Sequence, residues 1–298
     1  MPVRRLIVNA DDFGMTDGIN RAVLDLHPLG ALPSTTLMAA SPRFSEAVEI
    51  SRQQNNLGVG CHIVLVDGKP VANPLAISSL LDPTSGAGEP PCFRTTLGQF
   101  VRDLHLGRID KAHIEQEATA QILRLQQADV AVTHVDTHKH THMFSGVLDG
   151  VMRAAEACSV ATIRNPFEPA WSVAATPGAG IVRTWQVRVL GTLRHTFLKL
   201  VRQRGFTTTD GCVGVAATGT LNVATLRALL HHLPEGTFEL VCHPAYMDDE
   251  LMATRTRLQQ SREVELAALK ALPSILRESP FPIQLINFGQ LSAGNVRN

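Results

Sequence analysis

Residues 5–14 read RLIVNADDFG, a short apolar run that leads straight into two carboxylates and a glycine. The apolar part, with β-branched Ile7 and Val8, is typical of a buried strand. Gly14 allows the chain to turn sharply after it. Asp11 and Asp12 therefore stand at the carboxyl end of a strand, which is where parallel α/β barrels place their active sites.

Similar units recur along the whole chain. Short apolar runs alternate with longer segments of helical period, which predicts repeated β-α units around a parallel sheet. Strands are expected near residues 6–10, 34–40, 57–63, 130–136, 160–164, 206–209, 238–243 and 283–288, and helices near 18–27, 44–53, 109–127, 147–157, 221–231 and 256–271. About eight strands close a TIM-type barrel, so we expect an α/β fold with one such domain over residues 1–298.

Two irregular stretches interrupt the pattern, at residues 67–96 and 165–180. The first is rich in Pro, Gly and Ser, and the second contains three prolines. Long loops on a rigid barrel usually shape the mouth through which a ligand enters.

The composition excludes several classes of protein. Lys and Arg together number 27, as do Asp and Glu, so no net field attracts nucleic acid. The five cysteines include no C-x-x-C pair, which favours reduced thiols packed in a core. The N-terminus lacks a signal-peptide apolar region and no run is long enough to span a membrane, so a soluble cytoplasmic protein is expected.

The strongest chemical signal is HVDTHKHTHMF, in which His134, Asp136, His138, His140 and His142 occupy every second position. If the strand continues, its period of two places all five side chains on one face. Imidazoles at this density are costly to bury without a cation, so a metal site is favoured over a solvated His-rich loop. A catalytic site needs about three protein ligands, so some of these side chains must serve other roles.

Two further strands end in histidine. GVGCHI places His62 and ELVCHP places His243 after apolar runs, each beside a cysteine that alternation sends to the opposite face. Either histidine alone is more often structural, but their shared position at strand ends brings them to the mouth that Asp11 and Asp12 reach. One aspartate can then bind a metal while the other accepts a proton.

Taken in order, LIVNADDFG, GVGCHIVLVDGKPV, HVDTHKHTHMF, TTDGCVG and ELVCHPAYMDDEL resemble the YdjC-like carbohydrate deacetylases, a family that includes chito-oligosaccharide deacetylases. The resemblance covers nearly the whole chain. The pairing of the second and third motifs looks especially like the hopanoid-biosynthesis-associated (HpnK) branch, which acts on a sugar-bearing lipid.

This resemblance implies a distorted TIM-like barrel, often a homodimer, that holds one divalent metal ion, Mg²⁺ or Zn²⁺. It implies Asp12, His62 and His138 as metal ligands and an N-acetylated amino sugar as substrate. His140 matches a histidine of the family motif and is a candidate for substrate binding. Lys139 stands where chito-oligosaccharide members usually have another histidine, which leaves chitobiose-type specificity open.

Roles for the remaining candidates follow from chemistry and from similarity. Asp11 is the expected general base, by similarity to polysaccharide deacetylases that pair a basic and a ligating aspartate, and His243 would protonate the departing amine. Arg164 and Asp210 are weaker candidates for contacts to sugar hydroxyls, since an Asp before Gly is more often turn chemistry.

Residues 181–204 contain six Lys or Arg side chains and a tryptophan. They predict either a basic amphipathic helix in weak contact with an anionic membrane or, more commonly, a solvated outer face of the barrel. Other functions also stay open at this point. They are a different metal-barrel chemistry, such as phosphoester hydrolysis or sugar isomerisation, and a sugar-binding barrel without catalysis.

Overall fold

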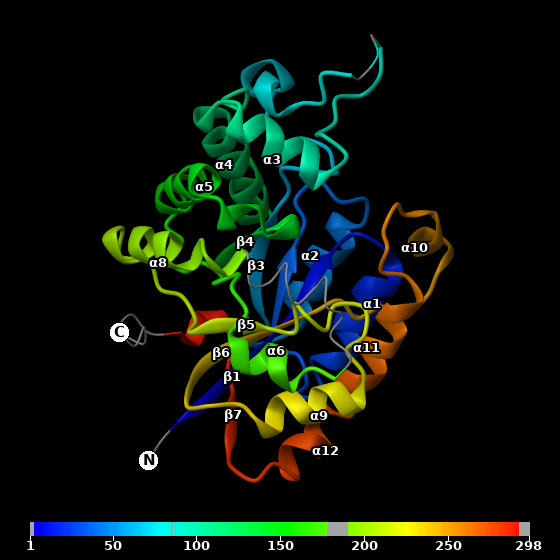
Figure 1. The fold of residues 1–298 in the computed structure, drawn as a ribbon. Helices are drawn as coiled ribbons and strands as arrows, with labels where there is room; N and C mark the ends of the chain where they lie inside the picture. Colours follow the sequence, from blue (N-terminus) through cyan, green and yellow to red (C-terminus); the bar gives the residue numbers. More distant parts are fainter. Residues whose placement is uncertain (1–2, 85, 87, 178–189, 292–298) are drawn as a thin grey trace.

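A computed structural model describes residues 3–84, 86, 88–177 and 190–291. Its sheet is parallel throughout and its helices surround it (Figure 1). The strands are β1 (Arg4–Phe13), β2 (Ser34–Leu37), β3 (Gly58–Ile63), β4 (Val132–Thr137), β5 (Gly211–Val213), β6 (Gly236–Cys242) and β7 (Ile283–Leu285). The expected α/β class is confirmed, as a distorted TIM-like barrel.

The strand order β4-β3-β2-β1-β6-β5 makes β1 the central strand. Its residues from Arg4 to Ala10 pair with β6. On the opposite edge, Arg4–Leu6 pair with β7, and β2 pairs with β1 between Asn9 and Phe13. Between β4 and β5 the predicted strands at 160–164 and 206–209 do not form. Single bridges, Val135 to Ile163 and Thr162 to Thr207, connect these two segments to β4 and to each other instead.

The helices follow the predicted pattern, with ends shifted by a few residues. All six predicted helices are present, as α1 (Asp17–Leu26), α2 (Phe44–Gln53), α4 (Lys111–Gln127), α5 (Ser145–Ala157), α9 (Val223–His231) and α11 (Gln260–Lys270). The structure adds the α-helices α3 (Leu97–His105), α6 (Ala170–Ala175), α8 (Arg194–Gln203), α10 (Asp249–Ala253) and α12 (Leu272–Arg277), and the 3₁₀ turns η1 (Pro74–Leu80), η2 (His138–Met143) and η3 (Phe288–Gln290). The two irregular stretches are thus partly helical.

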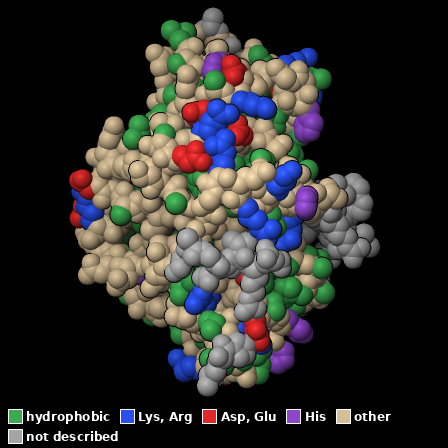
Figure 2. All heavy atoms as spheres, turned by 90° about the vertical axis from the view of Figure 1, so that its left-hand side faces the viewer, with side chains coloured by type: hydrophobic (Ala, Val, Ile, Leu, Met, Phe, Trp, Pro, Cys, Tyr) green, Lys and Arg blue, Asp and Glu red, His purple; other side chains and the backbone are tan. Residues whose placement is uncertain are grey.

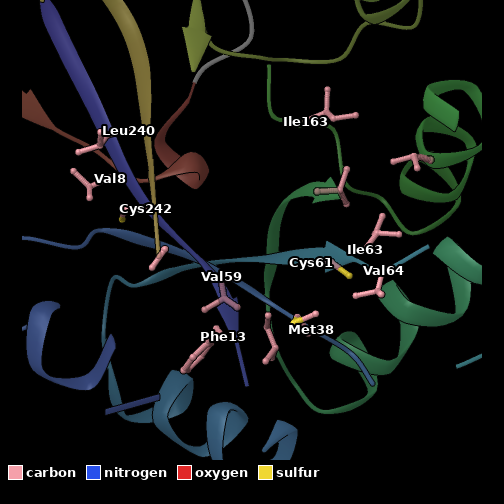
Figure 3. Packing of buried hydrophobic residues seen from close by; sticks show 14 of the residues in the cluster. Val8, Phe13, Met38, Val59, Cys61, Ile63, Val64, Ile163, Leu240 and Cys242 are labelled. Carbon is pink, nitrogen blue, oxygen red and sulfur yellow. The ribbon is translucent and has the colours of Figure 1, made fainter. Parts of the chain in front are cut away.

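The apolar core lies between the strands and the surrounding helices. Val8, Cys61 and Cys242 belong to this cluster, on the outer face of the sheet (Figure 3). Their neighbours in sequence point to the inner face, so the predicted alternation at Cys61-His62 is confirmed. Inside the barrel the strands carry polar side chains, such as His134 of β4. The ring of Phe288 stacks on His134 at a centroid distance of 3.7 Å.

The predicted basic segment is only partly described, because residues 178–189 lie outside the described ranges. Its remaining helix, α8, buries Phe197 and Val201 and exposes a basic face. Figure 2 looks onto this side, where Lys and Arg side chains lie beside Asp and Glu side chains. Arg204, just after α8, pairs with Asp149 and Glu156 of α5. Across the described ranges, no helix is both long and apolar enough to cross a membrane.

Candidate metal centre and surrounding residues

Asp11 and Asp12 both lie at the inner mouth of the barrel and are only 3% exposed. Adjacent strand residues normally point to opposite faces. Here the β1–β2 register shifts between Ala10 and Phe13, and Asp12 adopts a left-handed conformation with φ of 67°. This local departure from the strand brings two neighbouring carboxylates to one site.

Asp12, His62 and His138 meet at this mouth from three different strand ends. The Asp12 Oδ1 atom lies 3.7 Å from His62 Nε2 and 3.5 Å from His138 Nδ1, and the two nitrogens are 3.3 Å apart. Ligands 2.1 Å from an ion at tetrahedral angles are about 3.4 Å from one another. The three atoms therefore fit a single cation such as Zn²⁺.

A carboxylate behind His62 fixes the orientation of its ring. His62 Nδ1 lies 2.7 Å from Asp136 Oδ1, which leaves Nε2 directed at the cluster with Asp12. Burial lowers the pKa of His62, but Asp136 and Asp11 outweigh it and raise that pKa to about 9. A carboxylate–histidine pair of this kind is the usual support of a metal-binding imidazole.

Arg262 occupies the other oxygen of Asp12. Its Nη2 lies 2.5 Å from Asp12 Oδ2, its Nε donates to the Leu258 carbonyl, and it is 1% exposed. Asp12 thus presents one oxygen to the cluster, as a monodentate ligand would. Sequence reasoning missed this arginine, which lies 250 residues away on a helix whose pattern looks amphipathic.

Arg164 is fully buried beneath the site and contacts three carboxylates. Its two terminal nitrogens donate to both Asp11 oxygens at 2.8 and 2.7 Å, and it also pairs with Asp136 at 2.5 Å and Glu239 at 2.6 Å. Burial raises the pKa of Asp11, but the Arg164 guanidinium, with His62 and His243, holds it well below the usual range. The predicted contact of Arg164 with a sugar has no open space here, and its place is beneath Asp11.

Negative charge exceeds positive charge around this cluster. Five buried carboxylates lie around it. Asp11, Asp12, Asp136 and Glu239 contact the buried guanidinium groups of Arg164 and Arg262, and Glu265 lies beside His243. With His243 protonated beside Glu265 and the other histidines neutral, one divalent cation would balance the remaining negative charge. Two pKa values are raised within this set. Asp136 and Asp11 raise the pKa of His62 to about 9, and burial, which outweighs Arg164, raises that of Glu239 to about 7.

His243 faces Asp11 across the mouth, with Nε2 at 4.0 Å from Asp11 Oδ2. Glu265, which is 1% exposed, accepts the His243 backbone N–H at 2.6 Å and lies 3.8 Å from His243 Nδ1. Burial lowers the pKa of His243, but Glu265 and then Asp11 outweigh it, so the net shift is upward. Sequence reasoning also missed Glu265, because it reads as one more charged residue of a surface helix.

The histidine-rich segment does not continue as a strand, which corrects the expectation that its five side chains share one face. Strand β4 ends at Thr137, and η2 turns the chain at Lys139 and His140, both with positive φ. Only His134 and Asp136 keep the strand alternation. His142 is structural, because Thr137 Oγ1 lies 2.7 Å from its Nδ1 and the Arg164 carbonyl 3.2 Å from its Nε2.

The two remaining substrate-binding candidates lie in different places. His140 follows His138 by two residues and has a buried Nδ1 without a hydrogen-bond partner among the described residues. Burial, with Arg164, lowers its pKa to about 3. It is therefore a neutral imidazole. Asp210 is at the other end of the sheet, where it accepts the Thr237 backbone N–H at the start of β6. Its contact is with the strand and not with the mouth.

Comparison with known proteins agrees with this fold. The profile of a family described as YdjC-like protein matches residues 5–273. A protein named carbohydrate deacetylase from Geobacillus stearothermophilus is 30% identical over 287 residues, 96% of this chain and 97% of that protein. Another of that name, from Thermoanaerobacter pseudethanolicus, is 29% identical over 88% of this chain and 89% of its own.

One solved structure superposes along its length. It is described as a putative cellobiose-phosphate cleavage protein from Enterococcus faecalis, with a TM-score of 0.74 over 97% of this chain and 99% of that one. At 23% sequence identity, this likeness shows a shared fold.

Proposed function

Because this chain belongs to the YdjC-like protein family, we propose that it is a metal-dependent hydrolase that removes the acetyl group from an N-acetylated amino sugar. The observation that carries the proposal is the Asp12–His62–His138 cluster with a second, ionised carboxylate, Asp11, beside it. The relatives named carbohydrate deacetylase support the reaction class. We extend the proposal to an oligosaccharide or a sugar-bearing lipid as substrate, and to a homodimer of a single-domain chain.

The proposed base is Asp11. A divalent cation at the cluster would acidify water and polarise the acetyl carbonyl as a Lewis acid. Asp11 would take up the proton of the attacking water. Arg164 donates a hydrogen bond to each oxygen of Asp11, so the carboxylate cannot rotate away from the mouth. Arg164 also weakens Asp11 as a base, because its positive charge favours the ionised carboxylate.

The proposed acid is His243. An amide is cleaved only when its nitrogen leaves as an amine, which requires a proton at that nitrogen. Glu265 favours the protonated imidazole, and His243 Nε2 lies opposite Asp11 Oδ2. Base and acid thus flank the same space, from the ends of β1 and β6. His140, a neutral imidazole, is the proposed contact to a sugar hydroxyl.

The same geometry argues against the rival functions. Phosphoesterases of the two-metal type need bridging carboxylates for a second ion. Asp11, Asp136 and Glu239 could have formed such a set, but the Arg164 guanidinium lies among them. A sugar-binding barrel without catalysis would not need the spare carboxylate of Asp11 beside Asp12.

Acetate release tests the proposal. The protein loaded with Zn²⁺ or Mg²⁺ is assayed against chitobiose, other N-acetylhexosamines and glycolipids that bear N-acetylglucosamine, with phosphate release from phosphosugars as the comparison. Acetate from at least one acetylated sugar is expected, and phosphate release without acetate would refute the proposal. The variants H62A and H138A should lose bound metal by elemental analysis, whereas H231A, on the outer helix α9, should retain it.

A further inference from the structure

Two consecutive residues at the mouth, Lys139 and His140, adopt left-handed conformations with φ of 57° and 52°. In this conformation a side chain with a Cβ approaches the following carbonyl oxygen, so residues other than glycine occupy it only where their surroundings hold them there. The turn directly follows His138, whose ring position depends on it. Something must therefore stabilise this turn.

The inner end of the turn is fixed by Thr137. Its Oγ1 accepts the backbone N–H of His142 at 3.0 Å and lies 2.7 Å from the ring Nδ1 of that residue. These contacts close the turn at its base and are fully buried. They do not include Lys139, whose side chain contacts Asp67.

The outer end is fixed by an ion pair. Lys139 Nζ donates to Asp67 Oδ2 at 2.6 Å, and the two side chains are 32% and 25% exposed. Asp67 lies in the segment that follows β3, the strand that carries His62. The ion pair thus ties the segment after one proposed metal ligand to the residue after another.

The segment around Asp67 is anchored on both sides. Asp67 itself donates its backbone N–H to the Arg94 carbonyl at 2.8 Å. Before it, Gln121 bonds both backbone groups of Val64, and after it Glu117 accepts the backbone N–H groups of Val71 and Ala72. An ion pair to a fixed segment can hold a strained turn, whereas one to a free loop could not.

We propose that Asp67 and Lys139 are positioning residues, whose ion pair keeps the turn of His138–His140 in its strained conformation. The inference rests on the proposed metal site. With the pair intact, His138 Nδ1 stands 3.5 Å from Asp12 Oδ1 and 3.3 Å from His62 Nε2. Without it, the turn relaxes part of the time towards right-handed conformations, in which His138 is displaced from the cluster. A partly exposed ion pair contributes little to global stability, so the effect belongs to the site.

The test is metal binding by D67N and K139M. Titration of Zn²⁺ into the metal-free proteins should show about tenfold weaker binding for each variant, the scale of lost support for a ligand. The double variant should bind Zn²⁺ no more weakly than the single variants, because either substitution alone already removes the Asp67–Lys139 ion pair. K139R keeps the charge and should restore most of the affinity. Melting temperatures of the metal-free variants should stay near wild type.

The matched control is D129N. Asp129 also has a positive φ, 60°, and also forms an ion pair, at 3.4 Å with Arg52, but on the outer surface. Loss of the Asp129–Arg52 ion pair in D129N should leave the Zn²⁺ affinity unchanged. Unchanged affinity in D67N, or fully additive losses in the double variant, would overturn the positioning role.

Hydrogen exchange separates this inference from the proposed function. In the metal-free protein, amides of residues 137–144 should exchange faster in D67N than in wild type and D129N. If wild type binds no metal, the proposed function fails. The exchange rates then still test whether the Asp67–Lys139 ion pair holds the turn. Identical exchange in D67N and wild type would then refute it.

Discussion

At the scale of single residues, the chemistry depends on how each carboxylate is partnered. Asp11 and Asp12 are neighbours in sequence, yet Asp11 is held by Arg164 through both oxygens and Asp12 by Arg262 through one. The free Asp12 oxygen faces His62 and His138. Two chemically identical side chains are thereby suited to different roles, Asp11 to that of a base and Asp12 to that of a metal ligand.

D11N separates these roles. The amide can still accept a hydrogen bond from Arg164 but cannot take a proton from water, so turnover should fall by about 10²–10⁴-fold. Bound metal, measured by elemental analysis, should stay at the wild-type level because the ligands are untouched. Turnover at the wild-type rate would remove Asp11 from the role of base.

Glu239 should make the metal-free protein less stable as pH rises. Burial raises its pKa from 4.5 to about 7 in the folded state, although Arg164 opposes the shift. Below pH 4.5 the group is protonated in both states. Between pH 4.5 and 7 the unfolded chain gives up this proton more readily, so the free energy of unfolding falls, by on the order of 3 kcal/mol in total.

E239Q tests this linkage. Glutamine keeps an oxygen acceptor for Arg164 and cannot titrate. In denaturant unfolding with a chelator present, the free energy of unfolding of the variant relative to that of wild type should rise between pH 5 and pH 8. Parallel pH curves for the two proteins would mean that Glu239 has the same charge in both states.

At the scale of elements, the strand period of two predicts which face of the sheet a side chain takes, and it fails where a strand ends. His62 and Cys61 lie on opposite faces as predicted from the strand period. The histidine-rich segment departs from the period at Lys139, because a turn held by distant side chains replaced the strand. The pattern HVDTHKHTH is compatible with both conformations, and only the contacts of Asp67 and Thr137 decide between them.

Strand β3 needs a glycine at position 60. A Cβ there would lie 2.4 Å from His134 Cε1, and the ring cannot retreat because it stacks on Phe288. G60A should therefore lower the free energy of unfolding by roughly 1–3 kcal/mol. G98A, in α3 where no atom lies within 4 Å of the added Cβ, should keep or slightly raise it. Equal stabilities in chemical denaturation would contradict this close packing.

At the scale of the whole molecule, the barrel concentrates charge from strands far apart in sequence. The four buried carboxylates that contact Arg164 or Arg262 carry two more negative charges than these guanidinium groups neutralise, and a divalent ion would balance them. Arg164 already lies between Asp11, Asp136 and Glu239, so we expect one ion, at Asp12, His62 and His138.

Removal of metal should therefore destabilise the protein. An ion present at about 100 times its Kd stabilises the folded state by about 2.7 kcal/mol, which for a chain of this size amounts to a melting temperature several degrees higher. Chelation should lower the melting temperature by about that amount, and one equivalent of Zn²⁺ should restore it. A stoichiometry of two ions per chain, by elemental analysis, would contradict the assignment of Arg164.

The sequence by itself determined the β-α order, the inner and outer faces of the main strands, and the positions of Asp11, Asp12, His62, His138 and His243 at strand ends. These follow from local periodicity, which needs no knowledge of distant residues. Tertiary structure decided the partners: Arg164, Glu265 and Arg262 come to the site from 153, 22 and 250 residues away from the groups they contact. Such pairs depend on how the barrel closes, and closure is a property of the whole chain that no single stretch encodes.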